Sequence, residues 1–212
     1  GMEGPLAEAE IFDPAAETWS PAGSPQQARF YHSATLLDDG RVLVVGGSSA
    51  KDNPPVAVCE IYDPASGAWS RTGPLNQGRH NHAAALLAGG QVLVAGGLDN
   101  VNYLASAEIY DPVSGTWRVT NSMSKERALF SACTLTDGAV LAVGGEYDGN
   151  KYLASVERYN PARGVWSEAL PLRHERARHT VTVLQGGMVM ATGGYNGDDV
   201  LASSEIYGAE PR

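Results

Sequence analysis

The stretch "SAEIYDPVSGTW" (Ser106–Trp117) decides the fold, because the chain contains four versions of it. Near-copies begin at Ala9, Cys59 and Val156. Each version ends in a tryptophan, and the four tryptophans follow one another at intervals of 50, 48 and 49 residues: Trp19, Trp69, Trp117 and Trp166. A fixed period of this length indicates a stacked or radial array of one supersecondary unit.

Two further markers recur with the same period. A pair of glycines appears four times, as Gly46-Gly47, Gly96-Gly97, Gly144-Gly145 and Gly193-Gly194. An arginine lies 17 residues before the first glycine of each pair, at Arg29, Arg79, Arg127 and Arg176. Since the repeats run from end to end, we interpret residues 1–212 as a single domain.

Composition excludes several classes of function. The chain has 15 basic and 24 acidic residues in 212, a formal charge of -9, so it lacks the dominant basic face that nucleic-acid binding needs. No apolar run approaches the roughly 18 to 20 residues that span a bilayer, and no signal peptide stands at the start, so we expect no membrane insertion. The compartment stays open between exported and cytoplasmic.

Each repeat is predicted to hold four short antiparallel strands. In "YHSATLLDDGRVLVVGG" (Tyr31–Gly47), two apolar runs flank an Asp-Gly turn, which predicts a hairpin. The second run, Val42–Val45, has no polar alternation and is expected to be an inner strand covered on both faces. After a variable loop, the "AEIYDP" strand turns at Asp-Pro into the tryptophan strand. Four-stranded units repeated at this period form the blades of a β-propeller.

The combination of "R-x-x-H", "DGRVLVVGG", "EIYDP" and "W" resembles the kelch repeat of bacterial kelch proteins and galactose-oxidase-like propellers. The resemblance covers the chain from about Ala7 to Tyr207 and implies an all-β, kelch-type propeller with four repeats. Two departures occur: Phe130 replaces the histidine of the other repeats, and the last copy ends "EIYGAEPR" without a tryptophan strand.

The repeats are placed at about 28–75, 78–123, 126–171 and 175–207, with N-terminal strands 7–20 completing a blade. The chain then begins with a third and a fourth strand and ends with a first, second and third, so the segments around Ile11 and Ile206 compete for one place. A compact four-bladed monomer, a fragment of a larger ring, and open halves that pair as a homodimer all remain open. An open monomer is disfavoured, because it would expose unpaired edge strands.

Recurrence separates framework residues from functional ones, because a catalytic residue needs to appear once whereas a blade residue appears in every copy. Five glutamates recur on the third strands, with the arginines as plausible partners: Glu10, Glu60, Glu108, Glu157 and Glu205. Three histidines recur and are expected to form hydrogen bonds between blades rather than a zinc site: His32, His82 and His179. The four arginines allow two interpretations. They are structural residues of the blades, or they line a pocket for a partner, and the second role is the one that the resemblance to kelch domains implies.

The loops after the glycine pairs differ from one another and carry the side chains of a recognition surface. With the arginines Arg29, Arg79, Arg127 and Arg176, the binding candidates are Asp99, Tyr147, Asp148, Tyr195 and Asp198. Calcium binding by Asp148, Asp198 and Asp199 is not expected, since no calcium-loop spacing is present. The run "RHERARH" (Arg173–His179) is a local basic patch in an acidic chain.

We therefore expect a non-enzymatic interaction scaffold that presents its loop face to a protein, peptide or glycan. The alternative is a relative or fragment of a kelch-propeller enzyme of the galactose-oxidase-like or sialate-epimerase-like kind. Cys59 and Cys133 take strand positions and have no metal-ligand spacing, and no nucleophile elbow or HExxH motif occurs. We predict no catalytic residue, no metal and no cofactor.

Overall fold

The repeats fold into antiparallel sheets in the computed structural model, which describes residues 5–50 and 54–208. Three sheets have four strands each, and we name them blades 1, 2 and 3. Blade 1 contains β3 (Ser33–Leu36), β4 (Val42–Val45), β5 (Cys59–Asp63) and β6 (Ala68–Thr72). Blade 2 contains β7 (Ala83–Leu86), β8 (Val92–Ala95), β9 (Ala107–Asp111) and β10 (Thr116–Thr120). Blade 3 contains β11 (Ser131–Thr134), β12 (Val140–Val143), β15 (Val156–Asn160) and β16 (Val165–Ala169).

Incomplete sheets stand at both ends of this series. Blade 4 has three strands, β17 (Thr180–Val183), β18 (Val189–Thr192) and β19 (Ser204–Tyr207). Before blade 1, β1 (Glu10–Asp13) and β2 (Thr18–Pro21) form an N-terminal hairpin. A small hairpin in the loop of blade 3 comprises β13 (Glu146–Tyr147) and β14 (Lys151–Tyr152). The predicted all-β fold of four-stranded blades and the predicted order of strands are confirmed.

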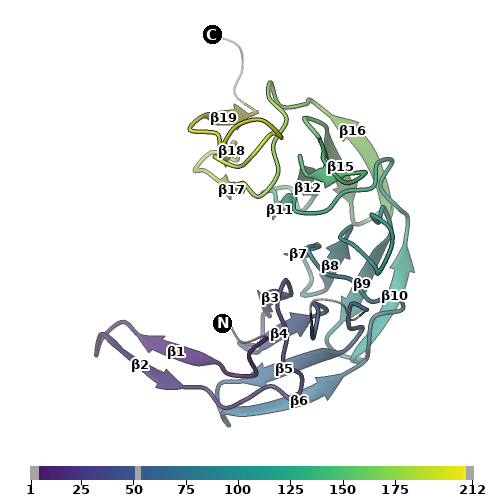
Figure 1. Ribbon diagram of the computed structural model, residues 1–212. Coiled ribbons are helices and arrows are strands. Elements are labelled where there is room, and N and C mark those ends of the chain that lie inside the picture. The colour runs from purple at the N-terminus through teal and green to yellow at the C-terminus, as the bar shows by residue number, and fades with distance from the viewer. Residues whose placement is uncertain (1–4, 51–53, 209–212) are drawn as a thin grey trace.

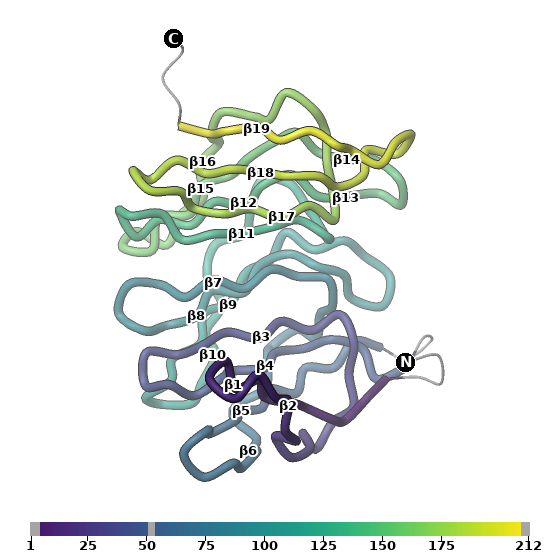
Figure 2. Tube along the Cα trace, turned by 90° about the vertical axis from the view of Figure 1, so that its left-hand side faces the viewer, coloured from purple at the N-terminus to yellow at the C-terminus, as the bar shows by residue number. Residues whose placement is uncertain are grey.

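The four blades form an open arc (Figure 1). Their first strands, β3, β7, β11 and β17, line the inner side of the arc, while β6, β10 and β16 form the outer side. Viewed from the side, each blade is stacked on the next (Figure 2). No helix in the described ranges is long and apolar enough to cross a membrane.

Within residues 5–50 and 54–208 the blades do not close into a ring, so the compact four-bladed monomer, one of the three arrangements left open by the sequence, is not the one seen here. Strands β1 and β2 pair with each other, and β19 pairs with β18. The N-terminal hairpin therefore does not complete blade 4, and it projects from the opposite end of the arc (Figure 1). The physical reason is the competition noted in the sequence: β1 already occupies the third-strand position beside β2.

Apolar side chains between successive blades form the core. In β8 of blade 2, Val92 and Val94 pack in a cluster with blade 1, whereas Leu93 and Ala95 pack in a cluster with blade 3. All four residues of this strand are buried. The lack of polar alternation in the second strand is thus explained by two covered faces, as the sequence predicts.

The recurring tryptophan links each blade to the one before it. Within a blade the indole ring packs on the tyrosine of the third strand, with ring centroids 5.1 Å apart for Tyr110 and Trp117. The indole N–H of Trp117 donates a hydrogen bond of 2.9 Å to the carbonyl oxygen of Gly73, which follows the last strand of blade 1. Equivalent bonds join Trp69 to Ala22 and Trp166 to Asn121. The repetition of "DPxxGxW" therefore serves blade stacking.

Candidate functional site

The recurring arginines form buried ion pairs with the recurring glutamates. The Nη2 to Oε distances are 2.5 Å for Arg29–Glu60, 3.0 Å for Arg79–Glu108, 2.7 Å for Arg127–Glu157 and 2.7 Å for Arg176–Glu205. The Arg127 side chain is fully buried, and its Nη1 also donates to the carbonyl oxygen of Gly144 at 2.7 Å. Burial lowers the pKa of Arg79 and Arg127 from its ordinary value. The partnership of arginine and glutamate expected from the sequence is present in every blade.

The glutamates also hold the links between blades. Glu157 accepts the backbone N–H groups of Ser124 at 2.7 Å and Lys125 at 3.2 Å. Glu60, Glu108 and Glu205 accept equivalent pairs of N–H groups from the segment before their own arginine. A buried carboxylate with this many charge-assisted bonds is a structural group. In the structure, the predicted binding residues Arg29, Arg79, Arg127 and Arg176 thus lie inside the blades, and their guanidinium groups are not exposed to a partner.

Two positions after each arginine, the backbone enters the left-handed region. The residues are Tyr31, Asn81, Leu129 and Arg178, with φ values of 58°, 53°, 54° and 57°. None is glycine, and such a conformation is uncommon for a leucine or tyrosine. Since residues held in sparsely populated conformations cluster at functional sites, this repeated feature is a candidate site.

These four residues form a backbone ladder from blade to blade. The N–H of Asn81 donates to the carbonyl oxygen of Tyr31 at 3.0 Å, that of Leu129 to Asn81 at 3.0 Å, and that of Arg178 to Leu129 at 2.7 Å. We call this set the inner lip: Tyr31, Asn81, Leu129 and Arg178. These hydrogen bonds use only backbone groups, so the ladder does not require a particular side chain at any of the four positions.

The inner lip borders a hollow of about 250 Å³. Its other lining residues are His32, His82, Phe130 and His179. Tyr31 is 58% exposed, and its ring lies 6.1 Å from the ring of His80, measured between centroids. Arg178 is exposed as well. The hollow thus presents an aromatic, an amide, an aliphatic and a cationic side chain on one rigid curve, which suits selective binding.

Of the three histidines beside the lip, His82 and His179 are buried, and His32 is exposed. Burial, with the nearby Arg79 charge, lowers the pKa of His82 to about 3, and burial with Arg176 lowers that of His179 to about 4. His82 Nε2 lies 2.8 Å from Ser33 Oγ in the preceding blade, so the predicted hydrogen bond between blades is present at His82. At His179 neither ring nitrogen has a hydrogen-bond partner among the described residues, so the prediction is wrong for that ring. Within residues 5–50 and 54–208, no group of three or more His, Cys, Asp or Glu is placed to hold a metal.

The predicted loop residues lie on the same face as the inner lip. Isolated bridges connect the residue before each lip position to the loop, as in Ala128 to Glu146 and Ala177 to Tyr195. The Lys125 ammonium group lies over the Tyr147 ring, 5.2 Å from the ring centroid. The rings of Tyr195 and Tyr152 pack edge to face, with centroids 5.5 Å apart.

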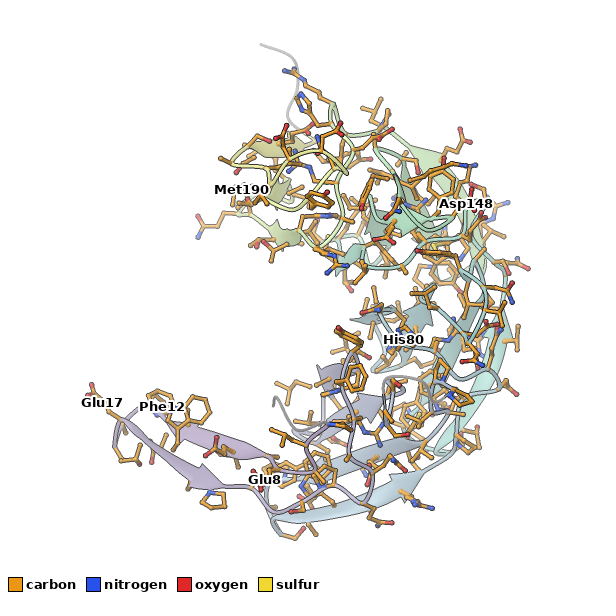
Figure 3. The ribbon with its side chains drawn as sticks, viewed as in Figure 1. Glu8, Phe12, Glu17, His80, Asp148 and Met190 are labelled. Atoms are coloured by element: carbon orange, nitrogen blue, oxygen red, sulfur yellow. The ribbon has the colours of Figure 1, made fainter. Side chains whose placement is uncertain are left out.

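The three predicted aspartates have different surroundings. The Oδ1 of Asp99 accepts the N–H groups of Val101 and Asn102 at 2.8 Å each, which closes its own turn. Asp148 pairs with Lys151 at 2.5 Å, and Figure 3 shows it near the outer side of blade 3. Asp198 is exposed. Two of the predicted loop residues, Tyr147 and Asp148, line the same hollow of about 300 Å³, together with Tyr103.

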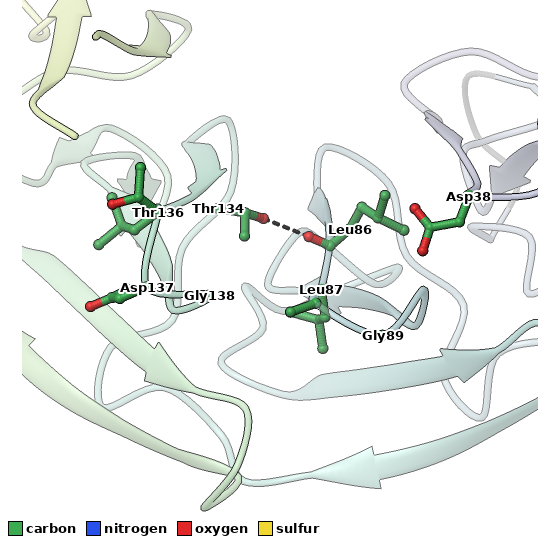
Figure 4. A pocket seen from close by; sticks show the side chains of 10 residues that line it. Asp38, Leu86, Leu87, Gly89, Thr134, Thr136, Asp137 and Gly138 are labelled. Atoms are coloured by element: carbon green, nitrogen blue, oxygen red, sulfur yellow. Dashed lines mark hydrogen bonds between the residues drawn. The ribbon is translucent and has the colours of Figure 1, made fainter. Parts of the chain in front are cut away.

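The opposite face carries a hollow made of the hairpin turns of blades 1 to 3 (Figure 4). It has a volume of about 480 Å³ and is lined by Asp38, residues 86–89 and residues 134–138. Figure 4 draws one hydrogen bond between lining residues, in which Thr134 Oγ1 donates to the carbonyl oxygen of Leu86 at 2.7 Å. The lining groups are turn residues that pack blade against blade, so this face offers fewer distinctive side chains than the inner lip.

Sequence reasoning missed the inner lip. The motif "R-x-x-H" contained a signal for it: the residue directly before the histidine position differs in every repeat, although the flanking arginine recurs. Arg178 lies inside the basic run "RHERARH" noted above, but the run does not reveal that Arg176 is buried and Arg178 exposed. None of the four lip residues is a glycine or part of an Asn-Gly pair, and only Asn81 is of a residue type that tolerates positive φ, so the left-handed backbone was not predictable from turn chemistry.

Comparisons with known proteins agree on the fold. The family model described as "KLHDC2/KLHL20/DRC7 Kelch-repeats domain" matches residues 6–194. The solved structure titled "Structure of YjhT" superposes with a TM-score of 0.79 and 14% identity, covering 93% of this chain and 71% of that one. No curated protein matches the sequence. At this identity the likeness to the solved structure concerns the fold.

Proposed function

Because the chain belongs to the kelch-repeat family, a propeller fold suited to protein interaction, we propose that it is a non-enzymatic interaction scaffold. The face that carries the inner lip and the loops after the glycine pairs binds a protein, peptide or glycan partner. One observation carries the proposal: four equivalent positions share one strained backbone conformation and hold four different side chains beside one hollow.

Charge and side-chain chemistry support this face. Tyrosine and arginine, which are enriched at binding hot spots, occupy the two ends of the inner lip at Tyr31 and Arg178. The loops above add Tyr147 and Tyr195, rings that supply contact area at low entropic cost. The backbone ladder holds the lip in place, so binding requires little ordering.

The enzyme alternative receives no support from the thiols. A copper-radical site of the galactose-oxidase kind requires a cysteine joined to a tyrosine beside the metal. Here burial raises the pKa of both Cys59 and Cys133 to about 11, so both thiols are protonated near neutral pH. Both lie on strands inside the blade stack, and Cys59 is fully buried.

The test compares two faces of the same protein. The labelled full chain is applied to peptide and glycan arrays, and Kd is then measured for the strongest ligand with three proteins: the native chain, the variant Tyr31→Ala/Arg178→Ala, and the variant Asp38→Ala/Thr136→Ala on the opposite face. Loss of two hot-spot side chains is expected to weaken binding about tenfold or more, whereas the control keeps the native Kd.

Two results would contradict the proposal. If the Asp38→Ala/Thr136→Ala variant loses binding and the Tyr31→Ala/Arg178→Ala variant keeps it, the binding face is the opposite one. If the native chain converts the bound compound into a product, observed by mass spectrometry after incubation, the protein is an enzyme.

A further inference from the structure

Blade 4 lacks a fourth strand within the described residues. Strand β19 pairs with β18 along one edge, and no strand formed by residues 5–50 or 54–208 lies along its other edge. Such an edge exposes a row of unpaired backbone N–H and C=O groups that can bind another strand. In blades 1, 2 and 3 the equivalent edge is covered by β6, β10 and β16.

Among the described residues, one backbone carbonyl group at this end also lacks the tryptophan that its counterparts bind. In each complete blade the indole N–H donates to the carbonyl group that follows the last strand of the preceding blade, at Ala22, Gly73 and Asn121. The next carbonyl in this series belongs to Leu170, directly after β16. Leu170 is 73% exposed. A tryptophan in the fourth-strand position of blade 4 would bind it.

The N-terminal hairpin carries the matching tryptophan. Phe12 and Trp19 pack with centroids 5.2 Å apart at 44°, nearly the geometry of Tyr62 and Trp69 at 5.1 Å and 44°. Every residue of β1 and β2 is nevertheless exposed, and Trp19 is 65% exposed. Figure 3 shows Phe12 on the projecting hairpin, away from the stacked blades. Trp19 is thus arranged as a blade tryptophan but has no blade to stack on among the described residues.

The turn after β19 differs from those that lead into the other fourth strands. In the other four copies an Asp or Asn side chain accepts a backbone N–H of this turn, as Asp63 Oδ1 accepts that of Ala65 at 2.9 Å and Asn160 Oδ1 that of Arg163 at 3.1 Å. Gly208, with φ of 81°, occupies the equivalent position after Tyr207. The side chain that caps this turn elsewhere is therefore missing, which favours a fourth strand that arrives from another part of the sequence.

We propose that β2 of a second copy of this chain binds along β19 as the fourth strand of blade 4. Trp19 then lies opposite Tyr207 and donates its indole N–H to the carbonyl oxygen of Leu170. In this arrangement β2 separates from β1, and β19 takes the position beside β2 that β1 held. The four residue pairs between β1 and β2 are lost, and four residue pairs between β19 and β2 form in their place. Trp19, exposed in one copy, becomes covered in the pair.

The arc and the symmetry favour a second copy over closure within one chain. The hairpin and β19 lie at opposite ends of the four stacked blades, on either side of the opening of the arc (Figure 1). Pairing of β2 with β19 inside one chain requires this opening to close, whereas a second copy brings its own β2 to β19. If each copy donates β2 to the other, the contact closes with two-fold symmetry and every blade has four strands. Two copies then supply eight complete blades, within the usual range for propellers.

The test uses two cysteine pairs that share one residue. In the hairpin, Ser20 lies opposite Ile11, whereas in the exchanged arrangement it lies opposite Ile206. Directly opposed strand residues have Cα separations of about 4.5 to 5.5 Å, which a disulfide can span. The variants Ser20→Cys/Ile206→Cys and Ile11→Cys/Ser20→Cys are oxidised, and their masses are compared on denaturing gels with and without reductant. The native thiols are a weak background, because Cys59 is buried and Cys133 partly so.

The proposal predicts that Ser20→Cys/Ile206→Cys forms a covalent species of twice the 22.3 kDa chain mass, lost on reduction. Light scattering of the native chain should give the same doubled mass, and Trp19→Ala should return it to one chain mass. Three results overturn the proposal: an intramolecular disulfide in Ser20→Cys/Ile206→Cys, which shows closure within one chain; no disulfide there while Ile11→Cys/Ser20→Cys forms one; or a native mass of 22.3 kDa at all concentrations. Ligand binding by the inner lip is measured separately and does not depend on these outcomes.

Discussion

Arg176 and Arg178 are two positions apart and have opposite roles. The Arg176 side chain is fully buried and pairs with Glu205 at 2.7 Å, and its counterparts recur in every blade. Arg178 is exposed at the inner lip with φ of 57°, and its counterparts are a tyrosine, an asparagine and a leucine. The comparison teaches that recurrence of a side chain marks the framework, whereas recurrence of a backbone conformation with changing side chains marks the binding surface.

The largest effect is expected from the framework arginine of blade 3, Arg127. The substitution Arg127→Ala leaves the Glu157 carboxylate buried without its cation, which typically destabilises a protein by about 3 to 5 kcal/mol. Urea unfolding followed by tryptophan fluorescence should show this loss in the free energy of unfolding. The matched variant Arg178→Ala should change that free energy by about 0.5 kcal/mol or less, as for an exposed residue.

A double variant refines the interpretation of this loss. Arg127→Met/Glu157→Met replaces both partners by apolar groups and should be less destabilising than Arg127→Ala, because no unpaired charge stays buried. Should Arg127→Ala and Arg178→Ala lower the free energy of unfolding equally, the distinction between framework and lip positions would be wrong.

Two glycines of blade 2 provide the second comparison, between a crowded and an open position. A Cβ on Gly96, at φ of 63°, would lie 2.5 Å from the Arg127 carbonyl oxygen and 2.7 Å from the Phe130 ring. Gly89, at φ of 98° in the turn of the same blade, has nothing within 4 Å. Gly96→Ala should therefore lower the free energy of unfolding by about 3 kcal/mol, from both crowding and backbone strain.

Gly89→Ala is the control for backbone strain alone and should cost about 1 to 2 kcal/mol. Both variants are compared by thermal and urea unfolding of the full chain. Equal losses would indicate that the close approach of blades 2 and 3 at Gly96 is not a constraint on the fold.

The blades were predictable from the sequence because each structural need is repeated in every copy. The inner strand of blade 1, Val42–Val45, shows two covered faces as an unbroken apolar run, and Trp117 shows its stacking role by its period. Closure was not predictable, because strand order alone cannot tell whether β2 pairs with β1 or with β19. Both pairings satisfy the same pattern of residues, and the choice depends on the geometry of the whole arc.

The candidate site was predictable only in part. The loop residues Tyr147 and Asp148 were found because their segments differ between repeats. Arg79 was predicted to lie on the same face. Its side chain is buried instead, because it pairs with Glu108 of a distant strand, and the local sequence around Arg79 does not indicate this contact. Asn81 and Leu129 were missed because backbone strain in non-glycine residues is imposed by hydrogen bonds from neighbouring blades.

Acid sensitivity should distinguish His82 from Phe130, which holds the same position in blade 3. The folded-state pKa of His82 is lowered to about 3 from 6.5, so below pH 6.5 the unfolded chain binds a proton that the folded chain does not. Stability from this residue is complete above pH 6.5 and falls as the pH decreases toward 3, by about 1.4 kcal/mol per unit. By pH 5 the loss is about 2 kcal/mol.

The variant His82→Phe reproduces the side chain of blade 3 and should remove this part of the decrease. The free energy of unfolding is measured in urea at pH 7 and pH 5 for both proteins. At pH 7 the variant loses the contact of His82 with Ser33, about 1 kcal/mol. An unchanged difference between pH 7 and pH 5 would show that His82 is protonated in the folded state.

The smallest effect on stability is expected at the inner lip itself. Leu129 is half-buried and holds φ at 54°, a conformation that asparagine adopts with less strain than leucine. In Leu129→Asn the relief of strain offsets the lost apolar contact, so the free energy of unfolding should change by less than about 1 kcal/mol. Ligand preference on the arrays should change instead, because the new amide lies beside that of Asn81. Destabilisation comparable to that of Arg127→Ala would mean that the Leu129 side chain belongs to the framework, and that the backbone ladder alone does not hold the lip.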